Sequence, residues 1–171
     1  MNEEIIKNIN TLISSKEFSQ AKELLKEEET QNPEDFYIQK NLGLCDVNLN
    51  LYDEAKSHFE KALKINEKDA TSWYYIGVLS ENMNLLEEAE RAYLKVVELR
   101  ETFADSYKNL SIIYMKKRNF VLAEQYSRKA IEYNPEDYQN YYILSSILIT
   151  QNCPEKVIEV LKKGIKLNPD H

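Results

Sequence analysis

The sequence has few residues that interrupt regular structure: only three of its 171 residues are glycine and four are proline. So few turn-forming residues argue against a β protein rich in turns and favour long helices joined by tight connections. A chain of this length can bury the core of one domain.

The chain also lacks basic character and long apolar runs. Its net charge is −7, whereas a nucleic-acid-binding protein needs a basic face against the phosphates, so we expect no nucleic acid as a partner. No apolar run approaches the roughly 18 residues of a membrane span, and the acidic start, residues 1–4, does not resemble a secretory signal, so we expect no membrane association. Cys45 and Cys153 are isolated thiols, which indicates a cytoplasmic protein.

Residues that carry catalysis are scarce as well. The only histidines are His58 and His171, and we expect His58, on an outer helix face, to be solvated. Neither cysteine has a histidine or acid at metal-ligand spacing, and no glycine-rich phosphate loop is present. We therefore expect no enzyme, no metal and no cofactor.

What the sequence does contain is a repeat of 34 residues that runs from Asn2 to His171 without a gap. The units are residues 2–35, 36–69, 70–103, 104–137 and 138–171, and positions within a unit are counted below as slots 1 to 34. Small residues recur at slot 8 (Gly43, Gly77, Ser111, Ser145) and at slot 20 (Ala21, Ala55, Ala89, Ala123). Small side chains at fixed spacing let two helices approach closely, while large apolar residues fill the space around them.

The apolar periodicity predicts two amphipathic helices in each unit. The ten predicted helices span residues 3–15, 19–31, 37–49, 53–65, 71–83, 87–99, 105–117, 121–133, 139–151 and 155–167. The run Asn-Pro-Glu-Asp at 32–35 and 134–137 predicts helix starts with asparagine as the N-cap and proline in the first helical position. Because one hairpin cannot bury its apolar stripe alone, we expect residues 1–171 to form a single domain.

These residues resemble the tetratricopeptide repeat family. The third unit is most similar, since Trp73, Ile76-Gly77, Ala89, Tyr93 and Val96 occupy the slots where the family has its characteristic residues. The resemblance covers residues 2–171 and implies an all-α fold, a right-handed superhelix of antiparallel helix hairpins. The sequence departs from the family pattern only in the terminal units, at Asn8, Glu28, Pro154 and Val157.

The resemblance further implies that the first helix of each unit lines a concave groove, which binds a peptide or helix segment of a partner protein. The residues of this chain in groove slots are Tyr37, Lys40, Asn41, Leu44, Tyr74, Tyr75, Val78, Lys108, Asn109, Ile112 and Tyr142. Tyrosines offer stiff contact area and asparagine amides can bond a peptide backbone. The alternative is that the aliphatic residues pack against neighbouring first helices and the asparagines bond locally.

Some receptors of this family bind the acidic tails of chaperones with a fixed set of groove cations and asparagines. No three consecutive units of this chain supply that set, so we expect no specific binding of such tails.

We therefore expect a non-catalytic scaffold or adaptor. The alternative function is a structural or regulatory self-assembly module that acts through its terminal repeats. The last predicted helix favours it, because slot 21 is charged in the first four units and is Ile158 in the fifth. We expect Ile158, Leu161, Ile165 and Leu167 to form an apolar patch, covered by a second copy in a homodimer or by sequence beyond His171.

Overall fold

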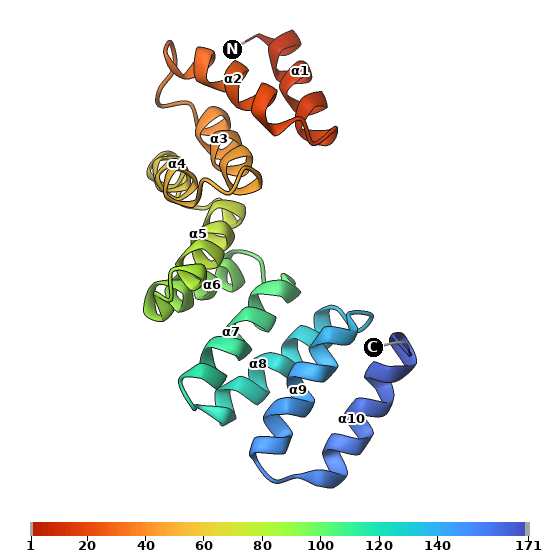
Figure 1. Ribbon diagram of the computed structural model, residues 1–171. Helices are drawn as coiled ribbons and strands as arrows, with labels where there is room; N and C mark the ends of the chain where they lie inside the picture. Colours follow the sequence, from red (N-terminus) through yellow and green to blue (C-terminus); the bar gives the residue numbers. More distant parts are fainter. Residues whose placement is uncertain (1, 170–171) are drawn as a thin grey trace. The chain divides into compact units, whose positions relative to one another are not determined.

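The computed structural model describes residues 2–169, which contain ten α-helices and no strand. The helices are α1 (Glu3–Ser14), α2 (Phe18–Glu29), α3 (Phe36–Asn48), α4 (Tyr52–Ile65), α5 (Ala70–Asn82), α6 (Leu86–Leu99), α7 (Ala104–Lys116), α8 (Phe120–Tyr133), α9 (Tyr138–Thr150) and α10 (Pro154–Leu167) (Figure 1). Each begins within one residue of its predicted start, so the all-α prediction and the two-helix unit are confirmed.

The chain divides into two compact units, Met1–Asn84 with α1 to α5 and Leu85–His171 with α6 to α10. Within each unit, helices that follow one another in the sequence pack together. The core of the first unit includes Ile9, Leu25 and Leu42, all fully buried. The division falls inside the third repeat, between its two helices. A single cooperative domain over residues 1–171 therefore stays a prediction.

The turn between the two helices of a repeat has one conformation in all five repeats. Its slot-15 residue has a positive φ of 57–62°, in the left-handed region: Lys16, Asn50, Asn84, Arg118 and Asn152. In the first repeat, the backbone N–H of Lys16 donates to Ile13 O and that of Glu17 donates to Leu12 O. This pair of hydrogen bonds is the Schellman motif, which satisfies carbonyl groups at the helix end.

The predicted asparagine–proline helix starts are wrong. The residue that caps α3 is Asp35, whose Oδ1 accepts from Ile38 N. Asp69 caps α5 by accepting from Ser72 N, and Asp137 caps α9 by accepting from Gln139 N. Asn134 instead lies at the carboxyl end of α8, where its N–H donates to Ala130 O. Both residue types accept hydrogen bonds well at an N-cap, and the short loop places the aspartate at the helix start.

The small residues at slot 8 allow close contact between the helices of one hairpin. A Cβ atom on Gly43 would lie 2.9 Å from Cζ of Phe59, so the α4 ring packs directly on the α3 backbone. The ring of Tyr75 in α5 stacks on the other side of Phe59, with centroids 5.0 Å apart. Glycine at position 43 is therefore required by the packing of Phe59.

Candidate partner-binding surface

In the first unit, groove residues of neighbouring first helices share one face. The hydroxyl of Tyr37 in α3 donates to Oδ1 of Asn10 in α1 over 2.9 Å. A shallow hollow runs along the same side of α1, lined by Glu3, Ile6, Lys7, Asn10, Thr11, Ser14 and Ser15. We call the exposed side of the odd-numbered helices, considered separately in each unit, the first-helix face.

The predicted groove lysines are held by the aspartates that cap the next first helix. Lys40 Nζ lies 3.0 Å from Oδ1 of Asp69, and Lys108 Nζ lies 3.1 Å from Oδ2 of Asp137. Lys108 also pairs with Asp105 over 3.0 Å. Burial lowers the pKa of Lys108, but its hydrogen bonds with Asp105 and Asp137 outweigh this and raise it overall. These cations are therefore balanced by carboxylates of the chain itself.

Apolar and aromatic side chains lie beside these ion pairs in the first unit. Leu44, Val78 and Tyr74 are half-buried, and Tyr74 meets Tyr75 edge to face with centroids 5.6 Å apart. Burial raises the pKa of Tyr75, which is committed to its stack on Phe59. Leu44, Val78 and Tyr74 thus provide the apolar contact area of this face.

The second unit presents a smaller version of the same surface. Ile112, Asn109 and Tyr142 are half-buried on α7 and α9. The ring of Tyr142 meets that of Tyr138 edge to face at 5.8 Å. The structure therefore gives each unit aliphatic and tyrosine contact area on its first-helix face.

The two groove asparagines differ in their surroundings. Asn41 is only 9% exposed, and its Nδ2 donates to Tyr37 O over 2.8 Å within α3, which is the local bond that the sequence allowed as an alternative. Asn109 is half-buried and has no side-chain hydrogen bond to another described residue. That either residue contacts a partner stays a prediction, and Asn109 is the better placed.

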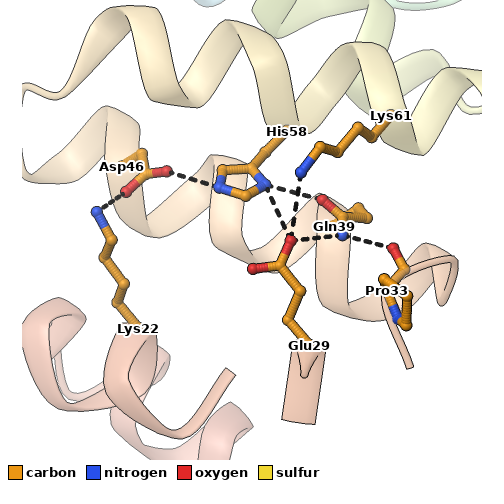
Figure 2. Close-up of polar contacts among 7 residues, drawn as sticks. All are labelled: Lys22, Glu29, Pro33, Gln39, Asp46, His58 and Lys61. Carbon is orange, nitrogen blue, oxygen red and sulfur yellow. Dashed lines mark hydrogen bonds and ion pairs between the residues drawn. The ribbon is translucent and has the colours of Figure 1, made fainter. Parts of the chain in front are cut away.

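The prediction that His58 is a solvated side chain is wrong. His58 belongs to a polar network that joins α2, α3 and α4, consisting of Lys22, Glu29, Gln39, Asp46, His58 and Lys61 (Figure 2). Its ring lies between Gln39 and the fully buried Asp46, and Lys22 Nζ lies 2.5 Å from Asp46 Oδ1.

The network fixes the tautomer of His58. Gln39 Nε2 donates to Glu29 Oε1 and to Pro33 O, so Gln39 Oε1 is the acceptor that faces His58 Nδ1 at 2.8 Å. In the neutral ring the proton therefore lies on Nδ1, and Nε2 faces Asp46 Oδ2 at 3.6 Å. Burial lowers the pKa of His58, and the nearby carboxylates of Asp46 and Glu29 offset this only in part.

The equivalent slots of the fourth repeat hold a tyrosine ladder, made of Tyr107, Tyr114, Tyr126 and Tyr133. Tyr126, in the slot of His58, stacks on Tyr114 at 5.3 Å, and Tyr107 lies 6.2 Å from Tyr126 and 5.3 Å from Tyr133. Tyr114 donates to Glu90 of the preceding repeat, which also pairs with Lys117. Slots 4, 11 and 23 thus form one layer between successive repeats in both units.

The last helix exposes apolar side chains, as the sequence predicts. Ile158, Ile165 and Leu167 are 57%, 48% and 36% exposed, and Leu161 is half-buried. Leu167 follows Ile165 by two residues and so points to a different side of the helix. Ile158, Leu161 and Ile165 follow the i, i+3, i+7 spacing of one helical face, and we call them the terminal stripe.

Two kinds of feature are absent from the described residues. None of the helices within residues 2–169 is long and apolar enough to cross a membrane. The same residues contain no group of three or more His, Cys, Asp or Glu side chains that could hold a metal ion.

Several solved structures share this fold. A crystal structure of MamA superposes with a TM-score of 0.87 at 16% identity, over 99% of this chain and 96% of that one. MamA residues 41 to the end from Desulfovibrio magneticus RS-1 gives 0.87 at 18% identity, over 98% and 94% of the two chains. YrrB, described as a TPR protein with an unusual peptide-binding site, gives 0.83 at 22% identity, over 98% and 86%.

No curated protein sequence matches the chain. The family model described as tetratricopeptide repeat matches residues 41–69, 70–103, 104–137 and 138–171, which is well over half of the sequence. Repeats of this family generally mediate interactions between proteins. On these four matches, which lie in the second to fifth repeats, the chain belongs to the tetratricopeptide repeat family.

Proposed function

We propose that this protein is a non-catalytic adaptor that holds a peptide or helix segment of a partner protein on its first-helix face. The observation that carries the proposal is the accessible apolar and tyrosine surface on the first helices, with Leu44, Val78 and Tyr74 in one unit and Ile112 and Tyr142 in the other. Half-buried aliphatic and aromatic side chains on rigid helices are the usual anchors of protein interfaces.

The ion pairs on this face indicate which segments fit. Lys40 and Lys108 are already neutralised by Asp69 and Asp137, so a carboxylate of a partner would have to displace a carboxylate that is held in place. The segment we propose is therefore apolar and hydrogen-bonding rather than strongly acidic.

We also propose a cytoplasmic location, consistent with the free thiols Cys45 and Cys153. Burial raises the pKa of Cys45 to about 11.

The experiment is an affinity capture from native lysate, followed by binding measurements with the purified partner and the Val78→Asp variant. Val78 is a half-buried aliphatic residue of the first-helix face on α5, and an aspartate there should weaken a saturable interaction at least about tenfold. The matched control is Val121→Asp, since Val121 is 65% exposed on the second helix α8. Binding that survives Val78→Asp and is lost in the control would refute the proposed surface.

A second variant tests the polar part of the proposal. Replacing Asn109 with alanine should weaken binding about three- to tenfold, the size of one lost hydrogen bond. Folding should be unaffected, because Asn109 has no side-chain hydrogen bond to another described residue. Unchanged affinity would remove Asn109 from the site and leave the apolar contacts as its only basis.

A further inference from the structure

The end of the last hairpin has the geometry of an interface that lacks its partner helix. The preceding repeat shows what normally covers this position. In α8, the slot-21 residue Glu124 is 22% exposed and hydrogen-bonds Gln151 at the end of α9. Farther along α8, Ser127 is fully buried, and Ile131 packs against the α9 residues Tyr141 and Leu144.

The terminal stripe occupies the same slots of α10, namely 21, 24 and 28, but it faces no described helix in this way. Ile158 and Ile165 remain 57% and 48% exposed, where their counterparts in α8 are covered by α9. Apolar residues at contact spacing on an uncovered helix are the signature of a helix–helix interface. The occupant of this surface must therefore be another helix with an apolar stripe.

The charges beside the terminal stripe identify that helix. Glu155, Glu159, Lys162 and Lys166 are all exposed and follow one another at spacings of four, three and four residues, which places them along one flank of α10. The amino-terminal half of this flank is acidic and its carboxyl-terminal half is basic. Glu159 also pairs with Lys163 of its own helix over 3.2 Å, and because both side chains are exposed this pair is weak and can be exchanged. Such a flank is complementary to a copy of itself that runs in the opposite direction.

The apolar positions have the same self-complementary spacing. In an antiparallel pair of α10 helices that sets Glu155 opposite Lys166 and Glu159 opposite Lys162 of the second copy, Ile158 falls between Leu161 and Ile165 of that copy. Interlocked aliphatic side chains with ion pairs along their side are typical of antiparallel helix pairs. A two-fold axis makes every such contact occur twice.

The amino-terminal end does not offer a comparable surface. The first-repeat residues in slots 4, 7 and 14, the slots through which α9 and its end meet α8, are Ile5, Asn8 and Ser15. Asn8 and Ser15 are exposed and polar, and Ile5 is half-buried against the core of its own unit. Stacking the end of one copy on the start of the next would therefore place Ser15 against Ile158 and Asn8 against Ile165. The pairing of α10 with α10 is therefore favoured over a head-to-tail chain.

From these observations, we infer that the protein forms a two-fold homodimer in which the α10 helices of two copies pack antiparallel through the terminal stripe. The interface is small, so the dimer is weak and dissociates on dilution. It leaves the first-helix face open, and it does not depend on the function proposed above.

The test is sedimentation equilibrium of the 171-residue chain from a few micromolar to about 200 μM, a range that covers affinities of a weak dimer. We expect the mass to rise from monomer towards dimer. Ile158→Lys should raise the dissociation constant at least tenfold, and Val121→Lys, at the exposed site on α8, should leave it unchanged. A strict monomer at about 100 μM, or self-association that Ile158→Lys does not weaken, would overturn the inference.

Charge reversals on the flank test the antiparallel register itself, because their effect does not depend on a loss of apolar surface. Glu159→Lys places two lysines opposite each other and Lys162→Glu places two acids opposite each other, so each single variant should weaken the dimer about three- to tenfold. The double variant restores opposite charges and should recover most of the affinity. Single variants that dimerise normally, or a double variant weaker than both, would rule out the antiparallel register. Circular dichroism of each variant checks that the hairpin is folded.

Discussion

The second and fourth repeats build the same layer from different chemistry. In both, the residue at slot 11 contacts slot 21 of the preceding repeat, and the residues at slots 4 and 23 belong to the same layer. The second repeat uses Gln39, Asp46 and His58 against Lys22, whereas the fourth uses three tyrosines against Glu90. The comparison teaches that this layer needs complementary shape between repeats more than it needs one residue type. The two layers should differ in their sensitivity to substitution. A buried charge that loses its partner is strongly destabilising, whereas a stacked ring that loses a neighbour costs less.

The largest effect is expected for Asp46→Ala in the polar network. The variant leaves Lys22 and His58 without the buried carboxylate that both face, and it opens space in the layer. We expect a loss of about 2–3 kcal/mol in the free energy of unfolding, measured with urea. The control Glu60→Ala removes an exposed acid from α4 and should cost less than about 0.5 kcal/mol. Equal effects of the two variants would contradict a structural role for the network.

A second variant replaces the ion pair of the polar layer by apolar side chains. Asp46→Leu combined with Lys22→Met replaces the ion pair by side chains of similar size. Buried ion pairs exchanged as a whole for apolar residues often cost nothing, so the double variant should recover about 2 kcal/mol relative to Asp46→Leu alone. The same urea measurements give the coupling energy. Additive losses from Asp46→Leu and Lys22→Met would show that the two side chains do not act as a pair.

The tyrosine ladder should be less sensitive. Tyr114→Phe removes the hydroxyl that donates to Glu90 but keeps the stack on Tyr126, and Glu90 keeps its pair with Lys117. We expect a loss of about 1 kcal/mol, the usual net worth of one hydrogen bond. Tyr52→Phe, which removes an exposed hydroxyl that donates to Asn50, is the control and should cost less. A loss as large as that of Asp46→Ala would mean that Glu90, and not the rings, holds this layer together.

The smallest effect is a dependence on pH near neutrality, which His58 gives to the polar network. The pKa of His58 is lowered in the folded protein, so the unfolded chain takes up the proton first as the pH falls through the ordinary value near 6.5. The contribution of His58 to the free energy of unfolding is therefore fully present above that pH and declines below it. The pKa of Glu29 is also lowered, and its contribution is lost at more acidic pH.

Hydrogen exchange at pH 7.5 and 5.5 can locate this effect. Amides of α3 and α4 should lose protection at the lower pH relative to those of α7 and α8, where the ladder contains no histidine. His58→Gln should remove the difference. Equal loss of protection in both pairs of helices would show that His58 does not control it.

The helices could be predicted from the sequence because periodicity is a local property. Small residues such as Gly43 and Ala55 recur at fixed spacing, and the structure confirms the hairpins that they predict. The role of His58 was missed because its partners lie on two other helices and in the preceding repeat. A signal was present, since slot 4 holds Gln39 where the third and fourth repeats have Trp73 and Tyr107. The two-unit division has no comparable signal around Asn84.

The groove residues were only partly predictable for a related reason. Their slots follow from the repeat, but whether a side chain is free depends on its neighbours. Tyr75 is taken up by Phe59, and the amide of Asn41 by its own helix. Asn109 occupies the same slot as Asn41 without such a bond. The repeat therefore predicts the position of a side chain on its helix, whereas the packing of neighbouring residues determines its contacts.

The pairing of Lys40 with Asp69 couples anion binding on the first-helix face to the stability of α5. The same aspartate that receives Lys40 also caps α5 through the N–H and hydroxyl of Ser72. An anion that drew Lys40 away would remove the counter-charge of that cap, so anion binding and the stability of α5 oppose each other through one carboxylate. Lys108 and Asp137 repeat the arrangement at α9. The two lysines thus act as thermodynamic links between the surface and the helix starts beneath it.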